Sequence, residues 1–379
     1  MVDDGSDKEW LAVGPHPFNK KQDNLYVAWT SFQNPTVVNP GGSSELRLAR
    51  STDGGASWTT KTLFAPVDAS GGFDPTVMSS FIQFANPVVD SSSGRLYIPF
   101  LHFSNTDADA IKVLISDDAG ATFRFVEFND PRALDKFGFA NVTPGLLNDC
   151  GRANGGIRNI LHQGADQGGG RFGLPRFRQA TRLITQPSAA VSKGRLFIAY
   201  NSSTSPFFGD PSAGSEINLL VLAKGGESIS GPFAVAPATA ADPQHVHPAV
   251  AVIDEGEKVS VAYYVQQANE KLRVDLTRVE LDGRRFQARL PEHVSSVAFN
   301  LIPSNIAFPV VGNPKFTTNY DRTIVACYNI GEYLGLVGHE AGLLAAWGDN
   351  RNSWTSPPRS PAAGTHAQPD VFFQEMGGQ

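Results

Sequence analysis

A polar residue lies ahead of each of five short apolar runs, and these five residues are the main candidates for chemistry in the sequence. They are Lys8, Asn86, Gln186, His247 and Glu332. They supply a cation, two amides, an imidazole and a carboxylate, and buried polar groups destabilise a protein unless they are paired. We expect a pocket for a small, partly apolar molecule, in which His247 or Glu332 moves a proton while Lys8 and Gln186 stabilise developing negative charge.

Aromatic and basic residues stand beside these five positions and complete the expected pocket. The residues expected to contact the substrate are Trp10, Phe84, Asn86, Arg182, His245 and Tyr333. The alternative interpretation is a polar plug, in which these side chains hydrogen-bond to one another around a water-filled axis where the apolar runs would converge. His245 and His247 share one face of a strand, but no zinc-ligand spacing accompanies them, so we predict neither a metal nor a cofactor.

A repeated strand pattern must position these residues. Each apolar run reads as the first strand of a hairpin, and its partner is a run that ends in an aromatic residue. These partners are "NLYVAW" (24–29), "RLYIPF" (95–100), "RLFIAY" (195–200), "KVSVAY" (258–263) and "GLLAAW" (342–347). A third run follows in most repeats, and in the first two it leads into a shared frame, Ser-x-Asp-x-Gly-x-Ser/Thr-aromatic, at residues 51–58 and 116–123.

Four-stranded antiparallel units repeated in this way predict an all-β chain, a β-propeller that forms a single domain over residues 1–379. Five blades are the simplest count, and six are the alternative if residues 124–180 conceal one. A pair of β-sandwiches competes with this prediction, but it would not require the same pattern five times. We interpret the Gly-rich residues 124–180 as a long insertion between blades that could act as a lid.

The two frames, "STDGGASW" and "SDDAGATF", resemble the Asp-box (BNR) repeats of sialidase-like propellers. The segments "HPAVAVIDEGEKVSVAYY" and "GEYLGLVGHEAGLLAAWGDNRN" are similar to blade segments of bacterial exo-sialidases. We expect the frame to be structural: Asp53 and Asp118 accept hydrogen bonds from turn amides, while Trp58 and Phe123 insert between sheets.

Sialidase chemistry itself is not expected, because the sequence departs from what the family needs. The early Phe/Tyr-Arg-Ile-Pro motif is missing, and Arg176 and Arg178 stand mid-chain. At the level of fold the chain is similar to fungal enzymes that guide hetero-Diels–Alder cyclisations. We therefore predict a non-hydrolytic dehydration and cyclisation in natural-product biosynthesis.

Two further functions stay open at this point. One is a sialidase-like glycoside hydrolase with a rearranged site, in which Glu332 pairs with Asp7 or Asp349. The other is a non-catalytic glycan-binding propeller. A lectin often repeats the same ligand residues in every blade, and here the five residues differ.

Composition argues against some binding partners and limits the cellular locations that we expect. The net charge is −6 and no run of Lys or Arg exceeds two, which argues against nucleic acid, and no apolar stretch reaches about 20 residues, which argues against a membrane span. The acidic start predicts a cytoplasmic protein, or a secreted one if a signal peptide was removed. Cys150 and Cys327 could form one disulfide or remain two buried thiols, and the oligomeric state is left open.

Overall fold

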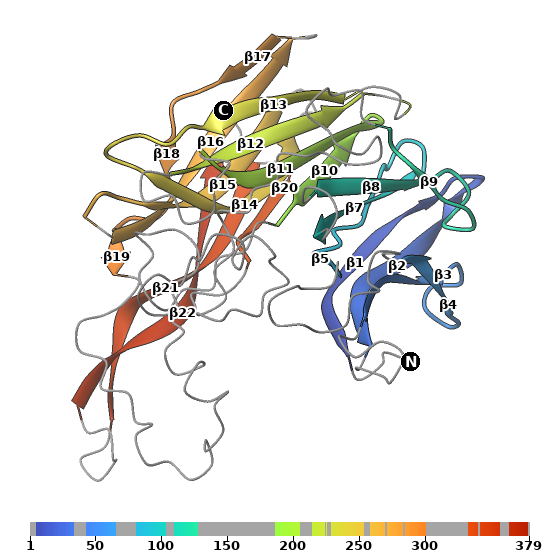
Figure 1. Ribbon diagram of the computed structural model, residues 1–379, viewed down its shortest axis with the longest axis horizontal. Coiled ribbons are helices and arrows are strands. Elements are labelled where there is room, and N and C mark those ends of the chain that lie inside the picture. Colours follow the sequence, from blue (N-terminus) through green and yellow to red (C-terminus); the bar gives the residue numbers. More distant parts are fainter. Residues whose placement is uncertain are drawn as a thin grey trace.

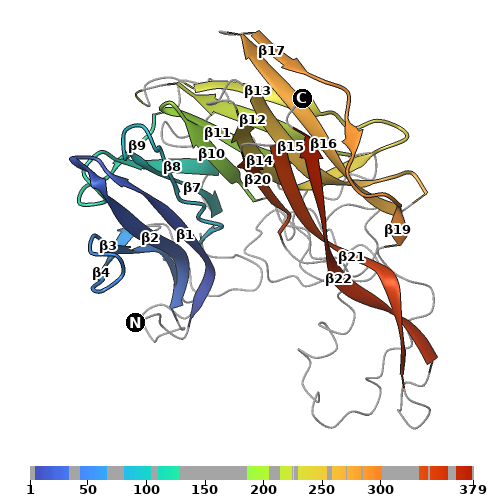
Figure 2. The same cartoon turned by 180° about the vertical axis from the view of Figure 1, so that it is seen from behind.

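The computed structural model of the chain is all-β and consists of antiparallel sheets (Figures 1 and 2). The structure describes residues 5–33, 43–65, 81–103, 110–127, 186–204, 214–223, 225, 229–253, 258–269, 271–282, 285–300, 333–339, 342–356 and 364–377. Within these ranges the strands form four sheets, and the ten-stranded one contains two successive meanders joined by one parallel bridge between Ser215 and Gln244. We call the resulting five groups of strands units 1 to 5.

Units 1, 2 and 3 lie between residues 6 and 236. Unit 1 contains β1 (Ser6–His16), β2 (Asn19–Gln33), β3 (Ser43–Ser51) and β4 (Thr59–Phe64). Unit 2 contains β5 (Phe81–Gln83), β6 (Val88–Val89), β7 (Leu96–Phe103), β8 (Ala110–Ser116) and β9 (Arg124–Phe125). Unit 3 contains β10 (Ser188–Ser192), β11 (Arg195–Ser203), β12 (Ser215–Leu222) and β13 (Ile229–Ala236).

Units 4 and 5 complete the chain. Unit 4 contains β14 (Gln244–Ile253), β15 (Lys258–Gln266), β16 (Lys271–Asp282) and β17 (Arg285–Ala288), with β18 (Glu292–His293) and β19 (Phe299–Asn300) also pairing with β16. Unit 5 contains β20 (Gly335–His339), β21 (Gly342–Ser356) and β22 (Gly364–Gly377). The hairpins, the third strands and the antiparallel all-β prediction are thus confirmed.

An apolar cluster fills each junction between successive units, so the core runs from sheet to sheet. Period-2 alternation explains this, because neighbouring residues of a strand face opposite sides of its sheet. In β11, Ile198 packs toward unit 2, whereas Phe197 and Ala199 pack toward unit 4. Clusters of the same kind join unit 1 to unit 2 and unit 4 to unit 5.

The Asp-box frame forms the turn between the third and fourth strands, as predicted. The Ser57 N–H donates to Asp53 Oδ1 at 2.9 Å, and the Thr122 N–H donates to Asp118 Oδ1 at 2.8 Å. Hydrogen bonds from the hydroxyl and amide of Ser57 hold the pKa of Asp53 at about 2. Each aspartate therefore braces its own turn.

The aromatic residues of the two frames differ from each other. Phe123 packs against the cluster between units 1 and 2, as expected. Trp58 is 44% exposed and its indole N–H donates to the Gly55 carbonyl, so the prediction that it inserts between sheets was wrong.

Several other expectations concern the connections between units. Arg124 and Phe125 form β9, so they belong to unit 2 and not to the predicted insertion. Val126 is described too and belongs to the apolar cluster between units 2 and 3. Residues 128–180 of that insertion, with Cys150, lie outside the described residues, as does Cys327. None of the described residues forms a helix long and apolar enough to cross a membrane.

Candidate functional site

The starts of the first strands converge on one pocket. Its described lining residues come from all five units: Lys8, Trp10, Phe84, Ala85, Asn86, Gln186, Pro187, Ser188, Pro248, Tyr333 and Leu334. The pocket is open, and the space of about 380 Å³ between these atoms includes solvent outside it. Residues separated by more than 300 positions in the sequence thus lie around one pocket.

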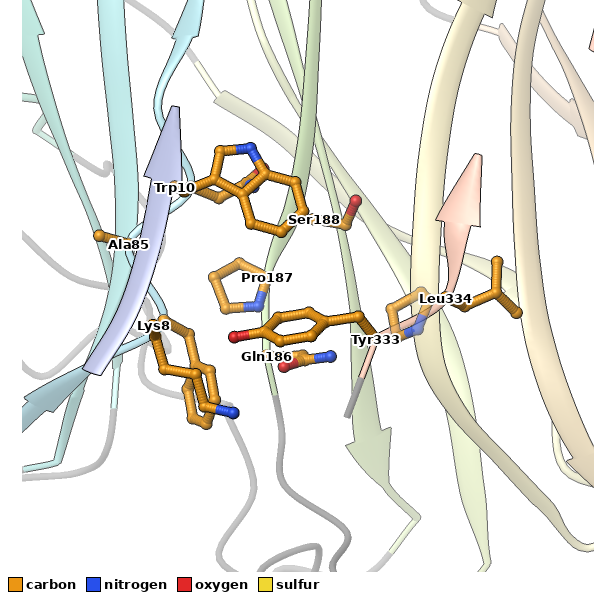
Figure 3. Close-up of a pocket in the computed structure, with 11 residues that line it drawn as sticks. Lys8, Trp10, Ala85, Gln186, Pro187, Ser188, Tyr333 and Leu334 are labelled. Carbon is orange, nitrogen blue, oxygen red and sulfur yellow. The ribbon is translucent and has the colours of Figure 1, made fainter. Parts of the chain in front are cut away.

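Aromatic rings from opposite ends of the chain form one wall of the pocket. Trp10 lies on β1 and Tyr333 lies just before β20, and their ring centroids are 5.7 Å apart with a 50° tilt (Figure 3). Trp10 is 39% exposed and Tyr333 is 40% exposed, so both rings are accessible to a bound molecule. Large aromatic surfaces left half-exposed in a pocket suit the flat face of a ligand.

The ammonium group of Lys8 lies between the rings of Tyr333 and Phe84. Its Nζ lies 4.8 Å from the ring centroid of Tyr333 and 5.5 Å from that of Phe84. An ammonium group over an aromatic face is attracted to the ring quadrupole. The cation–π contacts therefore fix the position of the Lys8 ammonium at the pocket.

Three residues at or beside the starts of the first strands have a strained backbone conformation. Lys8, Phe84 and His247 have φ values of 59°, 60° and 49°, in the left-handed region that residues other than glycine rarely adopt. At Lys8 and His247 the ladder register shifts, from Asp7 to Trp10 and from Val246 to Ala249. Bulges of this kind turn a side chain out of the regular alternation and are common beside functional sites.

The hairpin registers show which residues are equivalent between units. Trp10, Ser188, Ala249 and Gly335 each pair with the penultimate residue of an aromatic-ended run, and the Asn86 N–H donates to the Pro99 carbonyl at the same place in unit 2. The residues two positions before these are therefore equivalent between the units, and they are Lys8, Phe84, Gln186, His247 and Tyr333.

The predicted alignment of the first strands was therefore correct in three units, at Lys8, Gln186 and His247, and shifted in the other two. In unit 2, alignment on the Asn-Pro dipeptide selected Asn86, but this dipeptide lies two residues further along its hairpin than the Gln-Pro and His-Pro dipeptides of units 3 and 4, so Phe84 is the equivalent residue. In unit 5, Tyr333 occupies the position given to Glu332, which lies outside the described residues together with Arg182. Counting back from the aromatic-ended run would have identified Phe84 and Tyr333.

Asn86 has a structural task besides lining the pocket. Its side-chain oxygen accepts a hydrogen bond from the Ala189 N–H at 2.7 Å, which joins unit 2 to unit 3. Ser188, its equivalent in unit 3, accepts from the Val250 N–H at 3.1 Å and joins unit 3 to unit 4. The same register position thus braces two junctions.

The two histidines face the protein interior. His247 is 2% exposed, does not line the pocket, and its Nδ1 is buried without a hydrogen-bond partner. Burial and the nearby Lys8 lower the pKa of His247 to about 4, so its imidazole is neutral near pH 7. His245 lies against the Ser215 carbonyl and the ring of Tyr263, and burial lowers its pKa too.

Two of the three carboxylates considered for a hydrolase have hydrogen-bond partners, and the third, Glu332, lies outside the described residues. Asp7 accepts a hydrogen bond from Gln83 Nε2 at 2.8 Å, and Asp349 is fully buried and pairs with Arg351 Nε at 2.7 Å. Neither residue lines the pocket. Among the described residues no group of three or more His, Cys, Asp or Glu side chains could hold a metal ion.

No protein-family model matches the sequence, and no curated protein matches it. Among solved structures, the chain is similar to the GH93 alpha-L-arabinofuranosidase of Fusarium graminearum, with 13% identity and a TM-score of 0.40 over 79% of this chain and 71% of that one. It is similar to an alpha-L-arabinanase of Penicillium chrysogenum, with 13% identity and a TM-score of 0.41 over 98% and 93%. It is also similar to the Hadza microbial sialidase Hz136, with 9% identity and a TM-score of 0.45 over 93% and 54%. Likenesses of this level assign no activity to the chain.

Proposed function

We propose that the five units are the blades of a five-bladed β-propeller, and that its axial pocket binds a saccharide. The observation that carries this proposal is the half-exposed pair Trp10 and Tyr333 on the pocket wall. The C–H face of a sugar ring packs on an aromatic face, while its hydroxyls need hydrogen-bonding groups at the edge of the platform. Gln186, Ser188 and Lys8 supply such groups around the rings.

The pocket opens to solvent, so a sugar ring could lie on its aromatic wall while the rest of a saccharide stays outside. The four equivalent residues that line it, Lys8, Phe84, Gln186 and Tyr333, differ from one another. This difference supports one specific ligand over repeated lectin sites. Small-molecule recognition by this pocket is therefore the role we assign to the chain.

Binding to a panel of immobilised neutral and acidic saccharides, followed by calorimetry, tests the proposal. We expect Trp10→Ala and Tyr333→Ala to weaken the binding of any saccharide retained by the wild type at least about tenfold, since about 1.4 kcal/mol corresponds to a factor of ten. Phe18→Ala is the matched control, because Phe18 is exposed at the turn between β1 and β2. Equal affinity of Trp10→Ala and the wild type would contradict the assignment.

A non-hydrolytic reaction is the second candidate, and one observation favours it over hydrolysis. Lys8 is the one Lys, Arg, Asp or Glu among the described lining residues, whereas two-carboxylate hydrolysis needs carboxyl groups about 5 to 10 Å apart. Glu332, the carboxylate next to Tyr333 in the sequence, lies outside the described residues. Dehydration with cyclisation, in which Lys8 stabilises developing negative charge, needs no such pair.

Mass spectrometry of a retained ligand after incubation separates the three outcomes. Hydrolysis adds one water to the ligand, dehydration removes one, and simple binding returns it unchanged. We expect no addition of water, and release of 4-nitrophenol from 4-nitrophenyl glycosides would overturn that expectation.

A further inference from the structure

The turns between the first and second strands of units 1, 2 and 3 lie side by side, at the end of these strands away from the pocket. A Cβ atom at Gly94 would lie 2.5 Å from the Pro15 carbonyl oxygen, so the turn of unit 2 packs on the end of β1. The Tyr97 hydroxyl donates to the Gly194 carbonyl at 3.2 Å, so the turn of unit 3 packs on unit 2. We call the surface formed by these turns the turn face, and it comprises residues 16–22, 90–95 and 192–195.

The turn face carries a surplus of positive charge in a chain whose net charge is −6. Its cations are Lys20, Lys21, Arg95, Lys193 and Arg195. Asp90 is the one carboxylate within the three turns, and it is fully buried and accepts a hydrogen bond from the Ser92 hydroxyl at 2.7 Å. Asp23 and Asp117 lie beside the turns, and Asp117 pairs with Arg95. The three lysines are exposed, so the face presents cations to solvent.

The extent of this charge is set by the first three units. The corresponding turn of unit 4, residues 254–257, has three carboxylates in its sequence and lies outside the described residues. The turn face is therefore defined on units 1 to 3 alone.

Phe18 adds a large apolar side chain to the turn face. It is 77% exposed at the turn between β1 and β2, and this blue hairpin reaches the outline of the molecule in Figure 1. The Phe18 N–H donates to His16 Nδ1 at 3.1 Å, and the two ring centroids are 5.8 Å apart. Asn19 Oδ1 accepts from the Lys21 N–H at 3.4 Å. The turn thus holds its own conformation while the Phe18 ring stays in solvent next to two lysines.

An exposed aromatic ring flanked by lysines matches the chemistry of a membrane surface. The headgroups of anionic lipids attract Lys and Arg, and the boundary between headgroups and acyl chains accommodates an apolar ring. An acidic polymer would match the cations alone, whereas a bilayer also removes Phe18 from water. The combination of charge and apolar surface therefore favours a lipid surface as the partner.

We propose that the turn face binds the surface of a bilayer that carries anionic lipids. The Phe18 ring lies at the boundary of headgroups and acyl chains, and Lys20, Lys21 and Lys193 lie beside the headgroups. The pocket is at the opposite ends of the first strands, so it stays open to a ligand from solvent. This binding needs no helix that spans the membrane, and it does not depend on the proposed saccharide binding.

Sedimentation with lipid vesicles tests the proposal. We expect the wild type to bind phosphatidylcholine vesicles that contain about 30% phosphatidylserine at least about tenfold more tightly than vesicles of phosphatidylcholine alone. Salt at about 0.5 M should remove most of this binding, because it screens exposed charges over a few ångströms.

Variants of the turn face separate the two parts of the interaction. Phe18→Ala and the double variant Lys20→Ala with Lys21→Ala should each weaken binding to phosphatidylserine vesicles at least about fivefold. Phe18→Leu should bind like the wild type, because it keeps an apolar side chain. Leu290→Ala and Lys271→Ala are the matched controls, since both residues are exposed and lie outside the turn face.

Three results would overturn the proposal. A wild type that does not sediment with phosphatidylserine vesicles would exclude the bilayer, and Phe18→Ala with wild-type binding would exclude insertion of the ring. Retention on heparin without binding to vesicles would assign the face to an acidic polymer. Saccharide calorimetry keeps this test apart from the pocket: Phe18→Ala should retain saccharide affinity, whereas Trp10→Ala should lose it and still bind vesicles.

Discussion

The residues at the pocket are held by backbone that a regular strand would not provide. Lys8, Phe84 and His247 lie at equivalent places in three units, each with positive φ. Such a conformation costs of order 1–3 kcal/mol and persists only where surrounding structure maintains it. Lys8 and Phe84 line the pocket and His247 is buried, so the same backbone conformation directs a side chain to the pocket in two units and into the interior in the third.

His247 gives this site a pH dependence through stability. Its pKa is about 4 when folded against an ordinary value near 6.5, so the unfolded chain binds the proton first as pH falls. The free energy of unfolding should therefore decline between pH 6.5 and pH 4, by up to about 3 kcal/mol from this residue at about 1.4 kcal/mol per pKa unit.

The variant His247→Asn should remove part of that decline, because asparagine tolerates positive φ and does not titrate. The remaining part is expected from His245, whose pKa is lowered in the same direction. Urea unfolding at pH 7, 5.5 and 4.5 measures the effect. A variant with the same pH slope as the wild type would mean that His247 is not protected from solvent.

At the scale of elements, the first strands are braced to one another by side chains at a single register position. Asn86 and Ser188 each accept an N–H from the next unit. Removing either acceptor leaves a backbone N–H unpaired, which costs about 1–3 kcal/mol.

We expect Asn86→Ala and Ser188→Ala each to lower the free energy of unfolding by about that amount, with additive effects because they act at different junctions. Ser188→Thr keeps the hydroxyl and should restore most of the loss. Chemical denaturation gives the values. Full stability of Asn86→Ala together with lost saccharide binding would instead make Asn86 a ligand contact.

The hairpins were predictable from the sequence, but the register of their first strands was not. Aromatic-ended runs and alternating apolar residues identified β2, β7, β11, β15 and β21, because burial on both faces leaves a strong pattern. The Asn-Pro dipeptide of unit 2 lies two residues further along its hairpin than the similar dipeptides of units 3 and 4, so Asn86 was aligned where Phe84 belongs. Alignment from the second strand avoids the error, because the penultimate residue of each aromatic-ended run marks the same position in every unit.

At the scale of the whole molecule, burial depends on which units are neighbours. Trp58 has the same local sequence frame as Phe123, and its turn forms as predicted. Its exposure differs because unit 1 has no preceding unit packed on it among the described residues. The hairpins and third strands followed from the repeat, whereas the exposure of Trp58 did not, because no local pattern records which sheet lies against a turn.

The core at a junction offers a further prediction at this scale. Ile198 is fully enclosed between units 2 and 3. Ile198→Ala should lower the free energy of unfolding by about 2–5 kcal/mol, the range for large-to-small changes in a packed core. Chemical denaturation checks it, and a loss below about 1 kcal/mol would mean that the two units do not pack together in solution.

The ligand site that we propose is the pocket wall formed by Trp10 and Tyr333. Calorimetric titration of a retained saccharide into the wild type, Trp10→Ala, Tyr333→Ala and the Phe18→Ala control tests it most directly. We predict at least about tenfold weaker binding for both pocket variants and unchanged binding for the control. Equal affinity in all four proteins would contradict ligand binding at this wall.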